Sequence, residues 1–277
     1  MKQDRLAPIG AVLLLGFLLL AIFGPALAPY DPREVQVNEV GIAKRLEPPS
    51  AQHWLGTEAT GRDVLSQLLV GARVAVLVGF VAALLVVVIG TLIGLCAGYF
   101  GGWIDVVLMR LTDAAFVVPT IPFVVVVVAV SRPSLTSVVL AIALLFWRSS
   151  ARVIRAQTMA LRERPYIKAA RAAGSSDVRI IVRHLLPNVL PLATLYGAVG
   201  VQAAVTTEAS LSFLGFGDPS VLSWGRMLQY AFASGATRGA WWWVVPPGLM
   251  ITLLVLSVYL VRRGYEDVVN PRLRSRA

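Results

Sequence analysis

The sequence predicts an all-α membrane protein with six transmembrane helices and one large cytoplasmic loop. Hydrophobic residues make up 57% of the 277 residues and charged residues only 14%, whereas charged residues are about a quarter of a typical soluble domain. A hydrocarbon core of about 30 Å requires roughly 20 helical residues to cross it. Stretches without Asp, Glu, Lys, Arg or His cover residues 6–28, 74–104, 114–131, 133–147, 185–207 and 239–261, and most of them are long enough.

The first stretch has two interpretations. Lys2 and Arg5 precede an apolar run that ends in Ala-Leu-Ala at 26–28, as in a cleaved signal peptide. The run is long for a signal peptide, and Pro29 would directly follow the cleavage site, so a transmembrane helix is favoured. The orientation of the later segments is the same in both cases. We predict that residues 1–73 form this helix and an external connection.

The external connection, residues 29–73, is rich in proline and in charges of both signs. Within it, Thr60 followed by GRDVLSQLL predicts a turn that enters an amphipathic helix, with Val64, Leu65, Leu68 and Leu69 on one face. This helix fits either a surface helix at the membrane interface or part of an external gate or docking ledge.

The second predicted helix carries Gly90, Gly94 and Gly98. Small residues at four-residue spacing let two helix backbones approach closely in lipid. The ladder therefore predicts a tight contact, which we expect within this chain; a contact with another subunit is the alternative.

The third predicted helix contains Pro119 and Pro122, which predict a kink or a break and are candidates for lining a transport pathway. Just before this helix, Arg110 and Asp113 are three residues apart. They share a helix face, so we predict that they form an ion pair.

The fourth stretch is short, because its 15 residues span only about 22 Å at about 1.5 Å each. A turn at Arg132 and Pro133 is nevertheless required to place the basic segment 148–184 and the basic tail on the same side. Cytoplasmic segments carry the excess of Lys and Arg, so we predict that this side and both termini are cytoplasmic. Arg148 can then snorkel toward the interface and lengthen the helix.

Glu208 lies at the outer end of the fifth predicted helix and is an acid in otherwise apolar surroundings. Ionisable residues inside a membrane commonly mark a functional site. Because its predicted depth is close to the outer surface, we expect a solvated or gating residue.

The basic segment 148–184 holds nine Lys or Arg against two acids, hence +7 of the net charge of +10. Its alanine-rich part predicts a helix that ends at Gly174, since glycine closes helices in the left-handed conformation. The Ser-Ser-Asp that follows offers N-caps for a second, short helix that runs until Pro187. The alanines around this turn have small side chains, so the groove of another protein can close on it.

The stretch KAARAAGSSDVRIIVRHLLPN resembles the loop of the membrane subunits of bacterial ABC importers, whose pattern is Glu-Ala-Ala, three residues, Gly, nine residues, Ile, any residue, Leu-Pro. Lys168 stands in place of the glutamate and His184 in place of the isoleucine. The resemblance implies that this loop couples the chain to an ATPase. The implied coupling residues are Lys168, Ala169, Ala170, Arg171, Ala173, Gly174, Ser176, Asp177, Leu186 and Pro187.

The resemblance covers nearly the whole chain and narrows to the second permease subunit of the dipeptide, oligopeptide and nickel type. The segments that carry it are FGPALAPYDP, HWLGTEATGRDVLSQLLVGAR, YFGGWIDVVLMRLTD, TEASLSFLGFG, SWGRML and NPRLR. It implies a permease core at 74–264 with five transmembrane helices and a coupling loop at 148–188, followed by a cytoplasmic tail at 265–277. It also implies a bacterial inner-membrane location, a homologous partner permease, two cytoplasmic ATPase subunits that bind ATP and Mg²⁺, and an external solute-binding protein.

The sequence argues against several other functions. A Walker-type phosphate loop needs Gly-Lys-Ser/Thr, and glycine precedes none of the three lysines, so we expect no ATP hydrolysis and no cofactor on this chain. The single cysteine and two histidines on opposite sides predict no metal or catalytic site. The basic charge reflects cytoplasmic bias, not nucleic-acid binding. The alternative function is an ion-gradient-driven secondary carrier, which would usually place ionisable residues near the membrane midplane.

The charge distribution makes the orientation testable. In intact cells, Ser176→Cys and Ser275→Cys are expected to resist an impermeant thiol reagent, while Ala59→Cys reacts with it. Labelling of Ser176→Cys from outside would overturn the predicted orientation.

Overall fold

The computed structural model describes residues 6–269 of the chain. Lys2, Arg5, the NPRLR segment, Ser275 and the basic residues of the tail beyond 269 lie outside the described residues. The helices are α1 (Leu6–Leu27), α2 (Val64–Phe100), α3 (Gly102–Val117), α4 (Thr120–Ser131), α5 (Leu135–Arg162), α6 (Pro165–Ala172), α7 (Asp177–Ile180), α8 (Leu186–Phe213), α9 (Trp224–Ala233) and α10 (Trp241–Val269).

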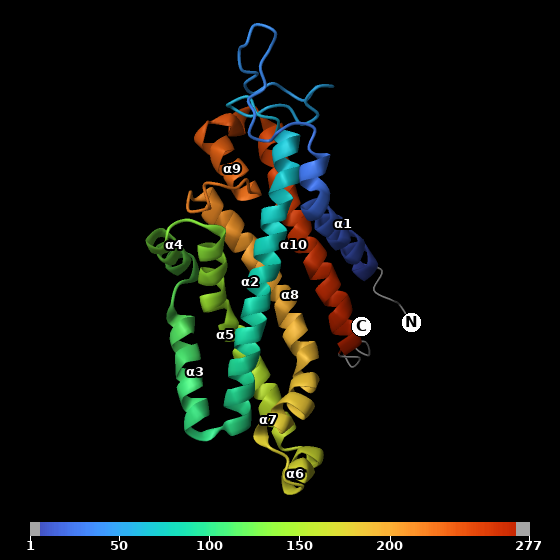
Figure 1. Ribbon diagram of the computed structural model, residues 1–277, viewed down its shortest axis with the longest axis vertical. Helices are drawn as coiled ribbons and strands as arrows, with labels where there is room; N and C mark the ends of the chain where they lie inside the picture. Colours follow the sequence, from blue (N-terminus) through green and yellow to red (C-terminus); the bar gives the residue numbers. More distant parts are fainter. Residues whose placement is uncertain (1–5, 270–277) are drawn as a thin grey trace.

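The long helices form an elongated bundle in which α2, α5, α8 and α10 run along the long axis (Figure 1). Five helical segments are long and apolar enough to span a membrane, and the bent pair α3 and α4 makes a sixth. The prediction of an all-α membrane protein with six spans is therefore confirmed. The irregular segment between α1 and α2 lies at one end of the bundle and α6 at the other.

The contact between α2 and α5 depends on the glycine ladder. A Cβ atom would lie 2.8 Å from the Ser150 Cβ at Gly90, 2.7 Å from the Ala151 carbonyl oxygen at Gly94, and 2.7 Å from the Arg155 carbonyl oxygen at Gly98. Real Cβ atoms essentially never approach so closely. The ladder thus packs two helices of this chain together, as predicted.

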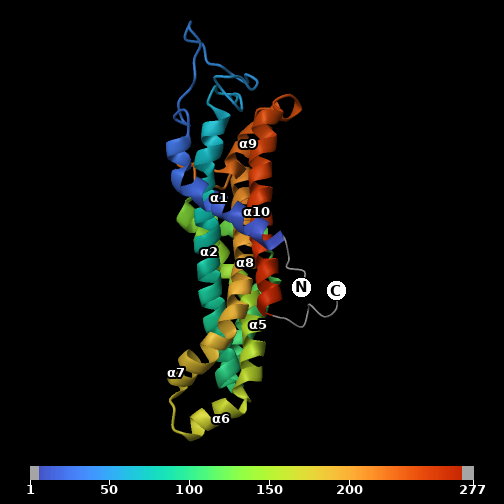
Figure 2. The ribbon, with the colours of Figure 1, turned by 90° about the vertical axis from the view of Figure 1, so that its right-hand side faces the viewer.

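Helix α1 crosses the bundle obliquely from α2 to α10 (Figure 2). A Cβ on Gly24 would lie 2.5 Å from the carbonyl oxygen of Leu69 in α2, and a Cβ on Gly10 would lie 2.5 Å from the Cβ of Leu260 in α10. The first apolar stretch is therefore packed into the bundle at both of its ends, which supports its role as a transmembrane helix.

Helix α2 begins at Val64, ten residues before the predicted start of the second span. Asp63 is its N-cap, and its carboxylate accepts a hydrogen bond from the Ser66 amide at 2.8 Å. Val64 and Leu68 are buried. The predicted turn and helix start are therefore confirmed, but the helix is not a surface helix of the external connection, because these residues form the first turns of α2.

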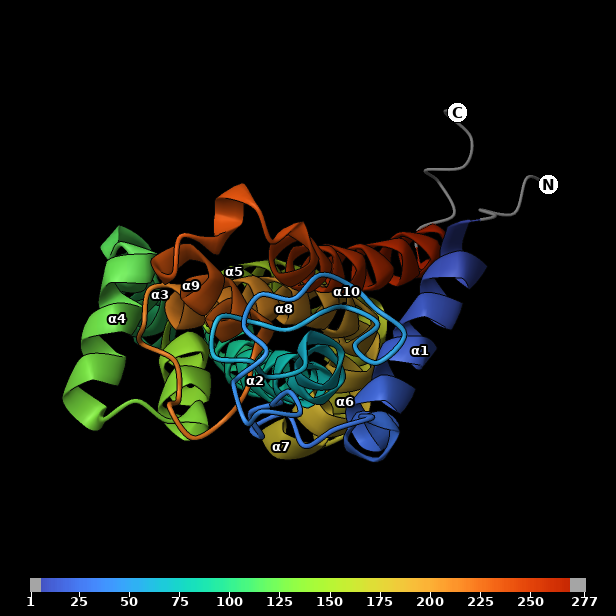
Figure 3. The same ribbon diagram turned by 90° about the horizontal axis from the view of Figure 1, so that it is seen from above.

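The third span is broken where the prolines predicted. Helix α3 begins at Gly102 and α4 at Thr120, and the two are bent by 92°. Val118 has the extended conformation (ψ 121°) that a following proline imposes. Pro122 lies in the first turn of α4, where a missing amide hydrogen is tolerated. Seen from above, α3 and α4 lie on one flank of the bundle and α1 on the other (Figure 3).

Arg148 does not snorkel to the interface, contrary to the prediction. Its guanidinium donates to the Ala115 carbonyl oxygen at 2.6 Å and to the Thr120 hydroxyl at 2.9 Å, so it bridges the break between α3 and α4. The fourth span needs no lengthening by Arg148, because α5 continues as a helix to Arg162.

The predicted turn at Arg132 is present, and Arg132 itself has φ 71°. The first part of the predicted loop at 148–188 belongs to α5, because a helix that leaves the membrane need not end at its first charged residue.

Asp113 pairs with Arg152 of α5 at 2.8 Å, so the predicted pair with Arg110 was wrong.

The glycine ladder gives a stability prediction. Gly94→Ala is expected to lower the free energy of unfolding by about 1 to 3 kcal/mol, because overpacking a tight contact forces the helices apart. Gly16→Ala in α1 is the control, since a Cβ at Gly16 meets nothing within 4 Å. The measurement is the apparent unfolding temperature of the detergent-solubilised protein. Equal temperatures for both variants would show that the ladder does not hold α2 against α5.

Candidate functional site

The predicted coupling segment folds as α6, a glycine turn and α7. Gly174 has φ +79°, in the left-handed region. Its amide donates to the Arg171 carbonyl oxygen at 3.0 Å, and the Ser175 amide donates to the Ala170 carbonyl oxygen at 3.1 Å. These two bonds form a Schellman motif, which satisfies the last carbonyl groups of α6. Ser176 then caps α7, so the predicted end of the first helix and the predicted start of the second are confirmed.

Three buried side chains fix this segment to the bundle. Ile167 of α6, Ile180 of α7 and Leu185 are fully buried and pack with Leu95 and Tyr99 of α2. Fully burying an aliphatic side chain stabilises by about 1.5 to 3 kcal/mol. The segment is therefore an integral part of the fold and has a defined position at the end of α2.

Polar contacts fix the same segment to the end of α2. The Tyr99 hydroxyl donates to the Asp177 carboxylate at 2.6 Å, and the Arg171 guanidinium carbon lies 5.5 Å from the centre of the Tyr99 ring. Arg162, the last residue of α5, donates to the Tyr99 carbonyl oxygen at 3.0 Å. Tyr99 thus joins α2, α5, α6 and α7, a role that the sequence pattern did not indicate.

The outer surface of the segment is exposed and mostly small. Ala169, Ala173 and Gly174 face solvent, and Val178 is 70% exposed. Lys168 lies 3.1 Å from the Glu163 carboxylate, and its ammonium, together with Arg162, lowers the pKa of Glu163. The surface therefore offers a shallow apolar centre flanked by charged groups, which suits docking to another protein better than catalysis.

The second helix does not end at Pro187, contrary to the prediction. After α7 the chain makes one π turn, Ile181–Leu185, and continues directly into α8, with the Leu186 amide donating to the Ile181 carbonyl oxygen. Proline lacks an amide hydrogen, and its ring crowds the carbonyl group four residues earlier in a helix. The wider π turn just before Pro187 gives the ring this space and lets the helix continue. Residues 177–213 thus form one continuous helical rod from the coupling segment across the bundle.

Comparison with known proteins gives the family. Residues 90–275 match the family described as binding-protein-dependent transport system inner membrane component, and residues 1–49 match the N-terminal transmembrane domain of oligopeptide transport permease C. The chain belongs to this permease family.

Curated relatives match the permease over almost its full length. It is 35% identical to the dipeptide transport system permease protein DppC of Alkalihalophilus pseudofirmus, covering 99% of this chain and 88% of that protein. It is 37% identical to a putative peptide transport system permease protein of Brucella abortus, covering 99% and 90%. The DppC protein of Bacillus subtilis is 32% identical, covering 99% and 84%.

Solved structures confirm the fold of the permease. A chain in an inward-facing structure of the MetNI methionine ABC transporter matches with a TM-score of 0.57 and 21% identity, covering 73% of this chain and 94% of that chain. This likeness supports the fold of the helical core. Family membership favours a permease subunit over the ion-gradient-driven carrier.

Glu208 lies in α8 at the end of the permease opposite the coupling segment. Pro187 and Glu208 are about 30 Å apart along the helix at about 1.5 Å per residue. Glu208 is only 3% exposed and accepts a hydrogen bond from the Ser212 hydroxyl at 2.6 Å. The solvated alternative was therefore wrong, because the packing of α9 against α8 encloses Glu208, and the gating alternative stays a prediction.

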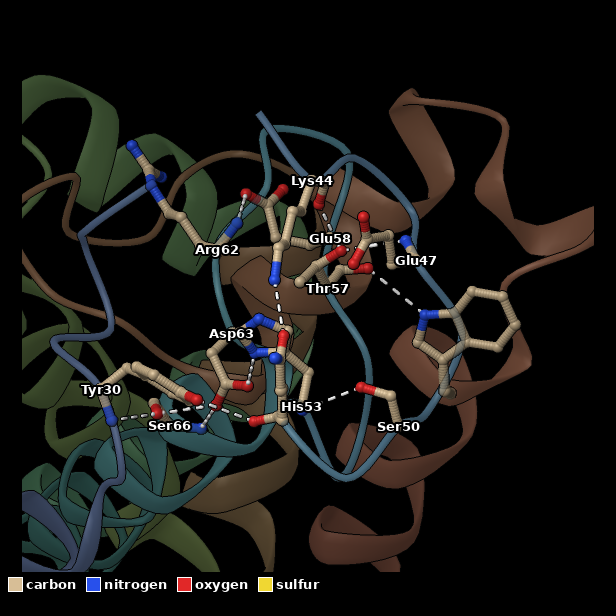
Figure 4. A network of polar contacts seen from close by, with 12 residues as sticks. Tyr30, Lys44, Glu47, Ser50, His53, Thr57, Glu58, Arg62, Asp63 and Ser66 are labelled. Carbon is tan, nitrogen blue, oxygen red and sulfur yellow. Dashed lines mark hydrogen bonds and ion pairs between the residues drawn. The ribbon is translucent and has the colours of Figure 1, made fainter. Parts of the chain in front are cut away.

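The segment between α1 and α2 contains a polar network that the sequence did not reveal (Figure 4). The His53 ring nitrogen Nδ1 lies 3.0 Å from the Asp63 carboxylate, and both side chains are buried. The Ser66 hydroxyl donates to Asp63 at 2.7 Å and accepts from the Tyr30 amide at 3.1 Å. The network fixes the irregular segment on the first turn of α2. Within residues 6–269, no three His, Cys, Asp or Glu residues are placed to hold a metal ion.

The Tyr99 contact gives a prediction for local stability. Tyr99→Phe removes a hydrogen bond to a carboxylate, a contact worth about 1.5 to 3 kcal/mol. Backbone amides in residues 165–180 are therefore expected to exchange hydrogen about 10 to 150 times faster. Tyr166→Phe is the control, because within the described residues the exposed Tyr166 hydroxyl makes no hydrogen bond. Unchanged exchange in Tyr99→Phe would exclude Tyr99 as an anchor of the segment.

Proposed function

We propose that this permease and a second, homologous permease together form the translocation pathway of an ATP-driven importer for peptides. The full-length similarity to dipeptide and peptide transport permeases supports the substrate class. An external solute-binding protein delivers the peptide and selects it. The pathway lies between the two permeases, so this chain supplies only one of its walls.

The proposal rests mainly on the coupling segment and its continuity with α8. Two cytoplasmic ATPase subunits bind ATP and Mg²⁺, and one of them closes its groove on the small surface around Gly174. Because residues 177–213 form one helical rod, a displacement of the segment moves α8 across the membrane. The permeases then rock between outward-open and inward-open states.

The replacement of the family glutamate by Lys168 leaves an acid at the docking surface. The carboxylate of Glu163 lies 3.1 Å from the Lys168 ammonium, and the Glu163 side chain is 61% exposed. The ATPase therefore meets an ion pair at this position instead of a lone carboxylate. A basic group on the ATPase can still approach Glu163.

The charge distribution supports the orientation of the permease. The coupling segment and both termini lie in the cytoplasm, where Lys and Arg accumulate. The irregular segment 28–63 and α9 then face the outside, where they meet the solute-binding protein. The apolar surface of α3 and α4, with Val117 83% and Val130 82% exposed, is available to the partner permease or to lipid.

Pro119, Pro122 and Glu208 are the proposed pathway or gate residues. The 92° break between α3 and α4 gives the pathway wall a hinge. Next to Glu208, α9 packs closely on the outer end of α8, because a Cβ on Gly225 would lie 2.4 Å from the Ala209 carbonyl oxygen. Opening of the outer side therefore involves the packing of α8 against α9.

Substitution of Gly174 tests the coupling role. Gly174→Val is expected to abolish ATP-dependent uptake while membrane abundance stays normal, because a β-branched residue in the left-handed conformation costs about 1 to 2 kcal/mol. Its side chain would also project into the space where the ATPase groove closes, since a Cβ here meets nothing within 4 Å of this chain. The measurements are uptake, membrane abundance and ATPase co-purification.

Two controls accompany this variant. Gly174→Asn keeps a residue that tolerates the left-handed conformation, so it is expected to retain most of the uptake. Ser275→Val, in the tail, is expected to behave as the unmodified protein. Normal uptake by Gly174→Val would mean that this turn does not couple the ATPase to the pathway.

A further inference from the structure

A groove of about 470 Å³ lies between α1, α2, α8 and α10. Its walls are apolar and include Leu14 of α1, Phe80 and Leu84 of α2, Leu190 of α8 and Val258 of α10. All four elements are candidate membrane spans. The volume is within the range of about 300 to 1,000 Å³ that is usual for small-molecule sites.

The path of α1 explains why the groove exists. Helix α1 lies close to α2 at Gly24 and close to α10 at Gly10, so it crosses the bundle instead of following α2 (Figure 2). Leu14 lies between these two contacts and forms one wall. The other walls come from the half of α8 nearer the coupling segment and from the last turns of α10.

Among the described residues that line the groove, Arg262 of α10 is the only charged one. Its Nε atom is buried and makes no hydrogen bond within the described part of the chain. Its guanidinium carbon lies 5.8 Å from the centre of the Tyr259 ring. A buried donor without a partner costs about 1 to 3 kcal/mol, and more when it is charged. The positive charge of Arg262 in an otherwise uncharged groove is therefore suited to a ligand with a negatively charged group.

The sequence around Arg262 is typical of a membrane interface. Arg262 is the first charged residue after the apolar stretch 239–261, and the aromatic Tyr265 also lines the groove there. Aromatic residues concentrate at membrane interfaces, and basic pockets between transmembrane helices bind acidic lipid headgroups. A helix of another protein is about 10 to 12 Å wide, so the groove would hold only about one turn of it.

We propose that this groove binds an anionic phospholipid, with one acyl chain along the apolar walls and the phosphate accepting a hydrogen bond from Arg262. The assignment to the cytoplasmic leaflet rests on the proposed orientation of the permease. The bound lipid fills the space that α1 leaves open and places its negative charge beside the Arg262 guanidinium.

Photoactivatable lipids test this site. The complex of this chain with its partner permease and ATPases is placed in phosphatidylcholine vesicles that contain a trace of either phosphatidylglycerol or phosphatidylcholine with a diazirine on one acyl chain. Labelled peptides are then identified by mass spectrometry. We expect residues 80–87 and 190–201 to be labelled several-fold more by phosphatidylglycerol.

Two variants and a control, compared at equal amounts of assembled complex, define the contacts. Arg262→Gln is expected to lower labelling by phosphatidylglycerol about five-fold, the factor for one arginine near an anionic surface. Ala198→Phe, which fills the groove, is expected to remove labelling by both lipids. The control Arg263→Gln changes the neighbouring, exposed arginine and is expected to leave labelling unchanged.

Some outcomes would overturn the proposal. Equal labelling by the two lipids, or unchanged labelling in Arg262→Gln, would exclude an anionic lipid at this arginine. Cross-linking of the groove residues to the partner permease would identify the groove as a protein interface. None of these outcomes bears on transport, which is measured separately as ATP-dependent uptake.

Discussion

The close contact between α2 and α5 is the constraint on which the functional end of the molecule depends. The glycine ladder brings the two backbones together, and its last member, Gly98, lies beside Arg155 and Thr158 of α5. The ends of both helices therefore meet at one place, where Arg162 donates to the Tyr99 carbonyl oxygen. The coupling segment is built on this junction. Without the ladder, the end of α5 would not lie beside Tyr99, and Ile167 of α6 would lose the buried site in which it packs.

The contacts at the break between α3 and α4 reflect the absence of hydrogen-bond partners in the membrane interior. Backbone groups freed by a helix break need new partners, because lipid offers none. Arg148 supplies two donors, one to the Ala115 carbonyl oxygen at the end of α3 and one to the Thr120 hydroxyl at the start of α4. The break is thereby a defined structural element, and it could serve as a hinge in the proposed rocking of the permease. The charged guanidinium of Arg148 therefore makes its contacts within the chain and not at the membrane surface.

Local features of the sequence predicted much of the fold, because they carry their own physical cause. The apolar stretches, the glycine ladder, Pro119 and the left-handed Gly174 each act on the backbone nearby. Helix ends were less predictable, since α2 and α5 extend beyond the membrane and keep charged residues within regular helix. Contacts between distant residues, such as Tyr99 with Asp177 and Arg152 with Asp113, left no periodic pattern. The burial of Glu208 depends on the packing of α9 and was equally invisible.

We propose that this chain is a passive wall of a pathway driven by ATP hydrolysis on other subunits. The decisive measurement is peptide uptake into vesicles that contain the chain, its partner permease and both ATPases, with the binding protein outside and ATP inside. Uptake is expected to require ATP and the ATPases and to continue when ionophores abolish ion gradients. The chain alone is expected to hydrolyse no nucleotide. Uptake by the chain alone, driven by an ion gradient, would show instead that the chain is a secondary carrier.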